Sequence, residues 1–213
     1  MSNLSFNALR QANALRLPQF KNKRGEFAHS KPDGSDWTPA QWFQALIGEV
    51  GELAEARLAV EAGIGDEAEI GKEAADVQAY LDIFCMRALD ESGPDFWQTS
   101  QQSPQRALMH VIAHIGNYAN LRKKFERGDI DEVEFETGAR PHLMEAAMRL
   151  SGIASRLGME YADGPTVRMA HATGIDLAKA TESKFNEVSE RVGSSVALRD
   201  GVVVNDSTAE VAK

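Results

Sequence analysis

The feature that most constrains this chain is a pair of acidic motifs, each set in an apolar stretch. Glu49 and Glu52 are three residues apart, and so are Glu73 and Asp76. Residues with this spacing lie on one face of an α-helix, so each motif would present two carboxylates in one direction. The chain between the motifs is long enough for a glycine-rich turn. Two antiparallel helices would therefore bring four carboxylates together.

Converging carboxylates of this kind require a cation. They repel one another and raise each other's pKa unless a positive charge neutralises them. The flanking residues are small and apolar, so unpaired charge here would be costly. Mg²⁺ prefers such oxygen ligands, and Mn²⁺ is a substitute for it. The alternative is a solvated acidic helix face, which is the usual meaning of scattered glutamates in a helix.

Composition narrows the range of partners. The chain has 213 residues, and its 32 acidic and 23 basic side chains give a net charge of −9. A negative surface argues against broad nucleic-acid binding, although bound metal ions would still let the chain accept a small anionic substrate. No apolar run approaches the ~20 residues that span a bilayer, and the N-terminus lacks a signal pattern. We therefore expect a cytoplasmic protein with no membrane partner.

Hydrophobic periodicity and turn residues predict a succession of helices. Thr38 is a suitable N-cap with Pro39 at the first helical position, and Gly193 is a suitable stop for the final helix. In the tail, 196–213, an Asp-Gly turn between β-branched runs fits either a short hairpin or a disordered terminus. The acidic helix pair would occupy residues 37–92. The expected helices cover about residues 4–22, 39–62, 66–89, 104–127, 138–160 and 174–192.

The acidic motifs resemble the signature of a known superfamily. Glu-Val-Gly-Glu followed by Glu-x-x-Asp is similar to the motifs of the MazG-like all-α NTP pyrophosphatases, which include dCTP pyrophosphatases and dimeric dUTPases. Many members carry a further glutamate where this chain has Gly48, as the dCTP pyrophosphatase branch also does. The segment from Lys184 to Gly193 resembles the closing helix of phage and bacterial members. The resemblance covers about residues 5–195 and implies one all-α, MazG-like bundle over 1–195.

The activity that the resemblance implies is Mg²⁺-dependent hydrolysis of a (d)NTP to the monophosphate and pyrophosphate, for nucleotide-pool control. Glu49, Glu52, Glu73 and Asp76 fall on the four metal ligands of the family. Water would attack the α-phosphorus, with Glu49 or Glu52 doubling as the base. The protein would be a homodimer or a higher homo-oligomer. Two alternatives stay open, a non-catalytic nucleotide-binding regulator on the same fold and a helical interaction scaffold.

Further residues are candidates for holding the substrate. The family places base-recognising residues just ahead of the first acid pair, which implies Trp37 and Gln41, and Tyr80 also fits the family pattern. Asn186 could contact the edge of a base. A set of basic residues on two segments, Lys123 and Lys124 with Lys184 and Arg191, would clamp the triphosphate, although single basic residues are more often solvated surface charges.

The second half of the chain resembles the first. Residues 112–128 match residues 47–63 at a constant offset of 65, with Ile, Gly, Ala, Arg and Gly shared at five positions. His114 and Asn117 replace Glu49 and Glu52, and a looser alignment places His142 at the position of Glu73. We therefore expect a degenerate two-helix repeat over 104–160, a pseudo-dimer with one metal site, in which the histidines pack between helices. Chance similarity between amphipathic helices is the alternative.

Overall fold

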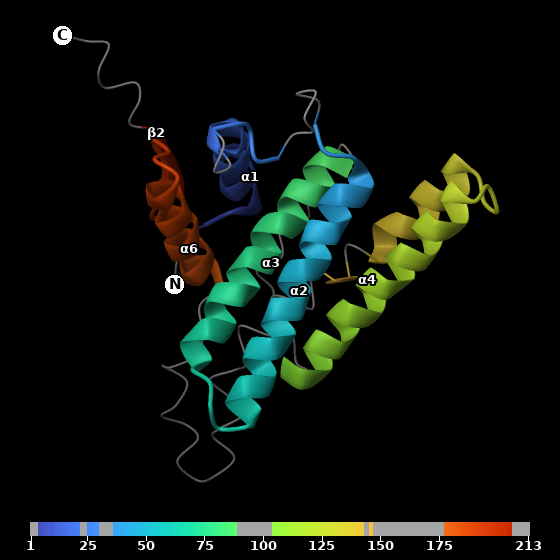
Figure 1. Ribbon diagram of the computed structural model, residues 1–213, viewed down its shortest axis with the longest axis horizontal. Coiled ribbons are helices and arrows are strands. Elements are labelled where there is room, and N and C mark those ends of the chain that lie inside the picture. Colours follow the sequence, from blue (N-terminus) through green and yellow to red (C-terminus); the bar gives the residue numbers. More distant parts are fainter. Residues whose placement is uncertain are drawn as a thin grey trace. The chain divides into compact units, whose positions relative to one another are not determined.

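The computed structural model describes residues 4–21, 25–29, 36–88, 104–142, 145–146 and 177–205. These residues are mostly helical, with one two-stranded sheet (Figure 1). No helix among them combines the length and the apolar character that a membrane crossing needs. Residues 132–142 and 145–146 are helical. The other elements are α1 (Phe6–Arg16), η1 (Leu17–Gln19), α2 (Pro39–Glu61), α3 (Glu67–Ala88), α4 (Pro104–Glu126), α6 (Leu177–Arg191), β1 (Val196–Arg199) and β2 (Val202–Asn205).

The chain divides into two compact units. The first unit contains Met1–Leu53, Gly71–Asp95 and Asp176–Lys213. The second unit contains Ala54–Ile70 and Phe96–Ile175. The long helices α2 and α3 each contribute residues to both units, but all four acids of the two motifs belong to the first. The candidate site that these acids form can therefore be described within the first unit.

A capping box begins α2 where the sequence predicts its start. Gln41 N donates to Thr38 Oγ1 (3.3 Å), and Thr38 N donates to Gln41 Oε1 (2.8 Å). At the other end Gly63 has a φ of 72°, and Ile64 N donates to Ala59 O (3.0 Å), so a left-handed cap closes the helix. The expected helix over residues 39–62 is thereby confirmed. The next helix, α3, begins at residue 67, one residue after the predicted start.

The core of the first unit is formed by apolar side chains from several elements. Trp42 and Leu46 of α2 are almost fully buried, and so is Phe84 of α3. The rings of Phe43 and Phe84 lie 5.8 Å apart between their centroids, which packs α2 against α3. Leu9 of α1 is also fully buried. The apolar face of each acidic helix therefore packs into the core of this unit, as the small and apolar neighbours of the motifs indicate.

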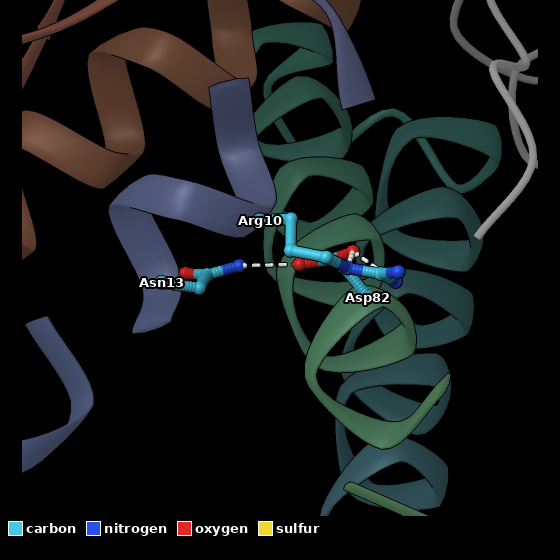
Figure 2. Close-up of polar contacts among 3 residues, drawn as sticks. All are labelled: Arg10, Asn13 and Asp82. Atoms are coloured by element: carbon cyan, nitrogen blue, oxygen red, sulfur yellow. Dashed lines mark hydrogen bonds and ion pairs between the residues drawn. The ribbon is translucent and has the colours of Figure 1, made fainter. Parts of the chain in front are cut away.

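A buried carboxylate attaches α1 to α3 (Figure 2). Asp82 of α3 is fully buried, and its Oδ1 accepts from Arg10 Nη2 (2.8 Å) and Nε (3.1 Å). Its Oδ2 accepts from Asn13 Nδ2 (3.0 Å). A buried charge is tolerated only where such partners satisfy it, so the three residues have one favoured arrangement. This arrangement fixes the position of α1 beside α3.

The C-terminal residues form a hairpin, which was one of the two alternatives for the tail. β1 and β2 are antiparallel, with Arg199 opposite Val202. Asp200 and Gly201 have φ values of 53° and 79°, as the two central residues of a type I′ turn require. β1 packs against α6 and α1. The hairpin is therefore part of the first unit's core, and residues 206–213 lie outside the described residues.

The second unit contains α4 and the helical residues 132–142. Asp131 caps this second helix in a capping box, because Glu134 N donates to Asp131 Oδ1 (2.8 Å) and Asp131 N donates to Glu134 Oε2 (3.2 Å). The helix therefore begins at residue 132, and the predicted start at 138 is wrong because this capping signal was overlooked. Residues 95–103, and residues 147–160 of the expected helix over 138–160, lie outside the described residues.

Local structure repeats at the predicted offset of 65 residues. α2 and α4 each contain 23 residues, and α4 begins and ends 65 residues after α2 does. Gly63 and Gly128, at equivalent positions, have φ values of 72° and 76°. The following helices begin at residues 67 and 132, so the turns have the same length. No gap is needed, and Gly138, rather than His142 as in the looser alignment, takes the position equivalent to Glu73.

Candidate metal and anion site

Three of the four motif carboxylates converge. Glu49 and Glu52 on α2 and Glu73 on α3 each have a carboxylate oxygen within 4.8 Å of those of the other two. The fourth acid, Asp76, points a carboxylate oxygen at a cation of the protein, because its Oδ2 lies 3.0 Å from Lys184 Nζ. Asp76 lines the same cavity as Glu49 and Glu52. The predicted pairing of two i, i+3 motifs is therefore present, with one acid engaged by a lysine.

The electrostatics of the cluster reflect crowding and burial. Burial, together with the charges of Asp76, Glu52 and Glu73, raises the pKa of Glu49 to about 7, whereas Lys184 acts in the opposite direction. Burial also raises the pKa of Asp76, although the hydrogen bond from Lys184 opposes this. An additional cation would relieve both effects.

The donor set suits a hard divalent ion. Every ligand atom in the cluster is a carboxylate oxygen, and no thiolate or imidazole from the described part of the chain belongs to it. Mg²⁺ and Mn²⁺ favour such oxygen ligands, whereas zinc sites in proteins are usually built from histidine and cysteine. The residues present therefore fit Mg²⁺.

Beside the acids lies a cavity of about 260 Å³ in the first unit. Acidic and basic side chains both line it, a combination that suits a metal complex of a polyanion better than a neutral ligand. Tyr80 is in the wall, and burial raises the pKa of its hydroxyl to about 12, so it is protonated at neutral pH. The charged residues of the lining are Arg16, Glu49, Glu52, Asp76, Lys184 and Arg191.

Two of the predicted phosphate-binding residues come from α6, which the hairpin holds in place. Lys184 and Arg191 both line the cavity. Between them, Asn186 Nδ2 donates to Leu198 O (2.7 Å) and Leu198 N donates to Asn186 Oδ1 (2.7 Å). The amide of Asn186 therefore bonds the backbone of β1, and Asn186 does not line the cavity.

Arg16 is a functional candidate that the sequence analysis missed. It lies on the buried face of α1, one turn after Ala12, and it lines the cavity. Burial lowers the pKa of its guanidinium to about 9, with Asp76 and Tyr80 acting in the opposite direction, so the group is charged at neutral pH. A charged residue in line with Leu9 and Ala12 on an apolar face was the available sequence signal.

Aromatic side chains occupy another part of the cavity wall. Phe20 and His29 line it, and the His29 ring contacts those of Trp37 and Trp42 at centroid distances of 5.1 and 5.4 Å. His29 Nδ1 is buried and has no hydrogen-bond partner in the described part of the chain. Burial and Arg16 lower the pKa of His29 to about 4, so its ring is neutral at pH 7. His29 lies between two of the expected helices, and the sequence analysis did not single it out.

The structure does not bring all predicted substrate residues to the cavity wall. The ring of Trp37 contacts that of His29, and the side chain of Gln41 is part of the capping box of α2. Neither residue lines the cavity. Lys123 and Lys124 are exposed residues in the last turn of α4, which belongs to the second unit. Lys123 Nζ donates to Asn120 Oδ1 (3.3 Å). Their predicted role stays a prediction.

The two histidines of the second unit contact each other. His114 Nδ1 and His142 Nδ1 lie 3.1 Å apart, and the ring centroids are separated by 5.4 Å. One ring must therefore donate a hydrogen bond while the other accepts it. This contact joins α4 to the helical residues 132–142, which agrees with the expectation that these histidines pack between helices.

Comparisons with known proteins do not identify a family for this chain. No family model, no curated protein and no solved structure matches the chain. The functional argument therefore depends on the residues of the site and on the motif resemblance.

Proposed function

We propose that the protein is a Mg²⁺-dependent nucleoside triphosphate pyrophosphohydrolase, which cleaves a (d)NTP to the monophosphate and pyrophosphate. The observation that carries this proposal is the cavity in which the acids Glu49, Glu52 and Asp76 share the lining with Arg16, Lys184 and Arg191. A metal–triphosphate complex presents both a divalent cation and excess negative charge. A wall with carboxylates and fixed cations is complementary to that complex.

The residues that would hold Mg²⁺ are Glu49, Glu52, Glu73 and Asp76. When bound, the ion would neutralise phosphate charge and lower the pKa of a water molecule. Asp76 would act as a ligand through Oδ1 while Lys184 stays on Oδ2, or through both oxygens once Lys184 moves away. In either case the chain supplies a lysine beside the metal ligands that could contact a phosphate.

Glu49 is the best-suited proton acceptor. It lines the cavity and is more buried than Glu52, so its surroundings favour uptake of a proton, and a bound ion would lower its pKa from the value of about 7 that it has without metal. In the reaction, the oxygen of water bonds to the α-phosphorus and the bond from that phosphorus to the bridging oxygen breaks. A proton of the water moves to a carboxylate oxygen, and pyrophosphate leaves. Lys184 and Arg191 would hold its charge.

The aromatic part of the wall is suited to a nucleobase. Phe20 and His29 offer ring faces and edges for stacking. The buried Nδ1 of His29 lacks a partner in the described residues, so a polar edge of a base could bond to it. This part of the cavity would then decide which base is preferred. The homodimer or higher oligomer that the family resemblance implies remains part of the proposal.

Pyrophosphate release from each common NTP and dNTP, with and without Mg²⁺, tests the proposal. We expect metal-dependent release from a subset of the nucleotides. Glu49→Gln should reduce the rate by about 100-fold or more, while Glu55→Gln, which changes an exposed glutamate on the same helix, should leave it unchanged. Nucleotide binding without release would favour the regulator. Neither binding nor release would favour the scaffold.

A further inference from the structure

The guanidinium of Arg16 is held in one orientation by α6. It stacks on the ring of Phe185, with Cζ 3.5 Å from the ring centroid, and Nη1 donates to Phe185 O (2.7 Å). Nη1 also donates to Ser189 Oγ (3.4 Å). The residue is only 5 % exposed. A side chain with this packing and these bonds has little freedom to change rotamer, unlike a surface arginine.

A second anchor links Arg16 to the buried carboxylate of α3. Arg16 Nη2 donates to Asn13 Oδ1 (3.4 Å), and the other end of the Asn13 amide donates to Asp82 Oδ2 (3.0 Å). Figure 2 shows the Asn13–Asp82 bond beside the Arg10–Asp82 ion pair. Because Asp82 accepts only, the amide nitrogen of Asn13 must face it, and the amide oxygen is left for Arg16. The position of Arg16 is therefore set from two helices.

The charge of this guanidinium is not matched by its anchors. The three acceptors that the described residues provide are a backbone carbonyl, a hydroxyl and an amide, all of them neutral. Buried charges in proteins are normally paired with an opposite charge, because burial without one is costly. The carboxylate of Asp76, which lines the same cavity and whose charge favours the Arg16 guanidinium, already pairs with Lys184. A buried, fixed cation that makes no direct ion pair with a carboxylate of the described residues is suited to an anionic ligand at the cavity wall.

We propose that the Arg16 guanidinium binds a phosphate group of the ligand as a rigid anchor that does not depend on the metal ion. That the phosphate belongs to a nucleoside triphosphate or its pyrophosphate product rests on the proposed function. The three anchoring bonds use three of the five N–H groups of the guanidinium and leave Nε–H and one Nη2–H. Two N–H groups match the bidentate contact that arginine makes with phosphate. Arg16 positions the phosphate chain, while the carboxylates hold the ion.

Binding of inorganic pyrophosphate to the full-length chain in excess EDTA tests this anchor. Titration calorimetry should detect binding by the unaltered protein without metal. Arg16→Lys keeps the positive charge but removes the planar fork, and should weaken binding by about 10-fold to 100-fold. The control Arg122→Lys changes a helical arginine of the second unit and should alter affinity by less than about 2-fold. Equal binding by Arg16→Lys and the unaltered protein would overturn the proposal, and so would no metal-free binding.

A measurement on the unaltered protein covers the case in which Arg16→Lys fails to fold. In a ¹⁵N-edited NMR spectrum of the arginine Nε–H groups, the Arg16 signal should shift and saturate as pyrophosphate is added in EDTA. A signal that does not move at saturating pyrophosphate overturns the anchor. The outcome is separate from the proposed function: hydrolysis with an unmoved Arg16 signal removes only the anchor, whereas a shifted signal without hydrolysis of any nucleotide removes only the enzyme.

Discussion

Lys184 of α6 and Asp76 of α3 form an ion pair, with 3.0 Å between Nζ and Oδ2. Asp76 is the fourth acid of the two motifs, so a lysine of the chain already neutralises one of the four carboxylates. The pair is partly shielded, because the two side chains are only 17 % and 20 % exposed. A divalent ion bound at the other oxygen of the same carboxylate, Oδ1, would still repel the ammonium of Lys184. Metal binding and the position of Lys184 are therefore coupled.

Replacing Lys184 should separate metal binding from turnover. In Lys184→Met the acids lose their internal cation, so the metal-free site becomes more repulsive and Mn²⁺ should bind about 3-fold to 10-fold more tightly. Turnover should fall because the phosphate loses a cationic contact. Mn²⁺ binding followed by electron paramagnetic resonance, with a parallel rate assay, measures both quantities. Lys179→Met alters an exposed lysine of the same helix and should change neither. Weaker Mn²⁺ binding by Lys184→Met would contradict the coupling.

The raised pKa of Glu49 predicts how stability depends on pH in the absence of metal. Glu49 has a pKa of about 7 in the folded protein against an ordinary value of 4.5, so the folded state binds its proton more tightly than the unfolded chain does. The stabilisation that this proton provides is complete below about 4.5 and is lost as the pH rises through about 7. Glu49→Gln has no such ionisation and should remain stable over that interval.

The expected size of this effect is modest. A shift of this extent corresponds to about 3 kcal/mol, and solvent screening at a partly exposed carboxylate reduces it to roughly 1–2 kcal/mol. Urea unfolding at about pH 5 and about pH 8 in EDTA should therefore show Glu49→Gln gaining stability relative to the unaltered protein at the higher pH. A difference between the two proteins that is the same at both pH values would show that Glu49 is not strained in the folded state.

Replacing Asn186 should show whether this residue has a structural role or recognises a base. Its two 2.7 Å bonds to Leu198 join α6 to β1, and Asn186→Leu would leave a partly buried N–H and C=O without partners. We expect a loss of about 2 kcal/mol or more in the free energy of unfolding, with an unchanged order of preference among nucleotides. Glu187→Gln, at the neighbouring exposed position, serves as the control. A changed base preference at normal stability would instead support the predicted contact with a base.

The effects on stability of replacing Arg10 and Asp82, which form a buried ion pair, should not be additive. Asp82→Ala leaves the Arg10 guanidinium and the Asn13 amide without their acceptor, and should lower the free energy of unfolding by about 3 kcal/mol or more. The double variant Arg10→Met with Asp82→Leu should recover much of this loss, because it removes both charges and fills the space. Chemical unfolding of the single and double variants tests it. A double variant less stable than Asp82→Ala would refute this interpretation.

Local signals explain which parts of the fold were predictable from sequence. Thr38 with Pro39 specifies the start of α2, and the glycine at 63 specifies its end, so the acidic helices were placed within a residue or two. The convergence of Glu49, Glu52 and Glu73 followed from helical spacing together with an antiparallel pairing of the two helices. By contrast, the start of the helix at 132 was missed because its capping box was overlooked.

The residues that were missed depend on contacts distant in sequence. Arg16 reaches the site because Phe185 and Ser189, far along the chain, hold its guanidinium, and nothing adjacent to Arg16 indicates this. Asn186 was a candidate for a contact with a base because its partner, Leu198, lies in a hairpin that the sequence left undecided. Tertiary hydrogen bonds thus determined the roles that local sequence did not.

The most direct test of the proposed activity is turnover of the preferred dNTP in H₂¹⁸O with Mg²⁺, analysed by mass spectrometry of both products. We predict one ¹⁸O atom in the monophosphate and none in pyrophosphate, together with loss of turnover in Asp76→Asn. This result would place the attack of water at the α-phosphorus under control of the motif acids. Label in inorganic phosphate or pyrophosphate, or full activity of Asp76→Asn, would contradict the proposed function.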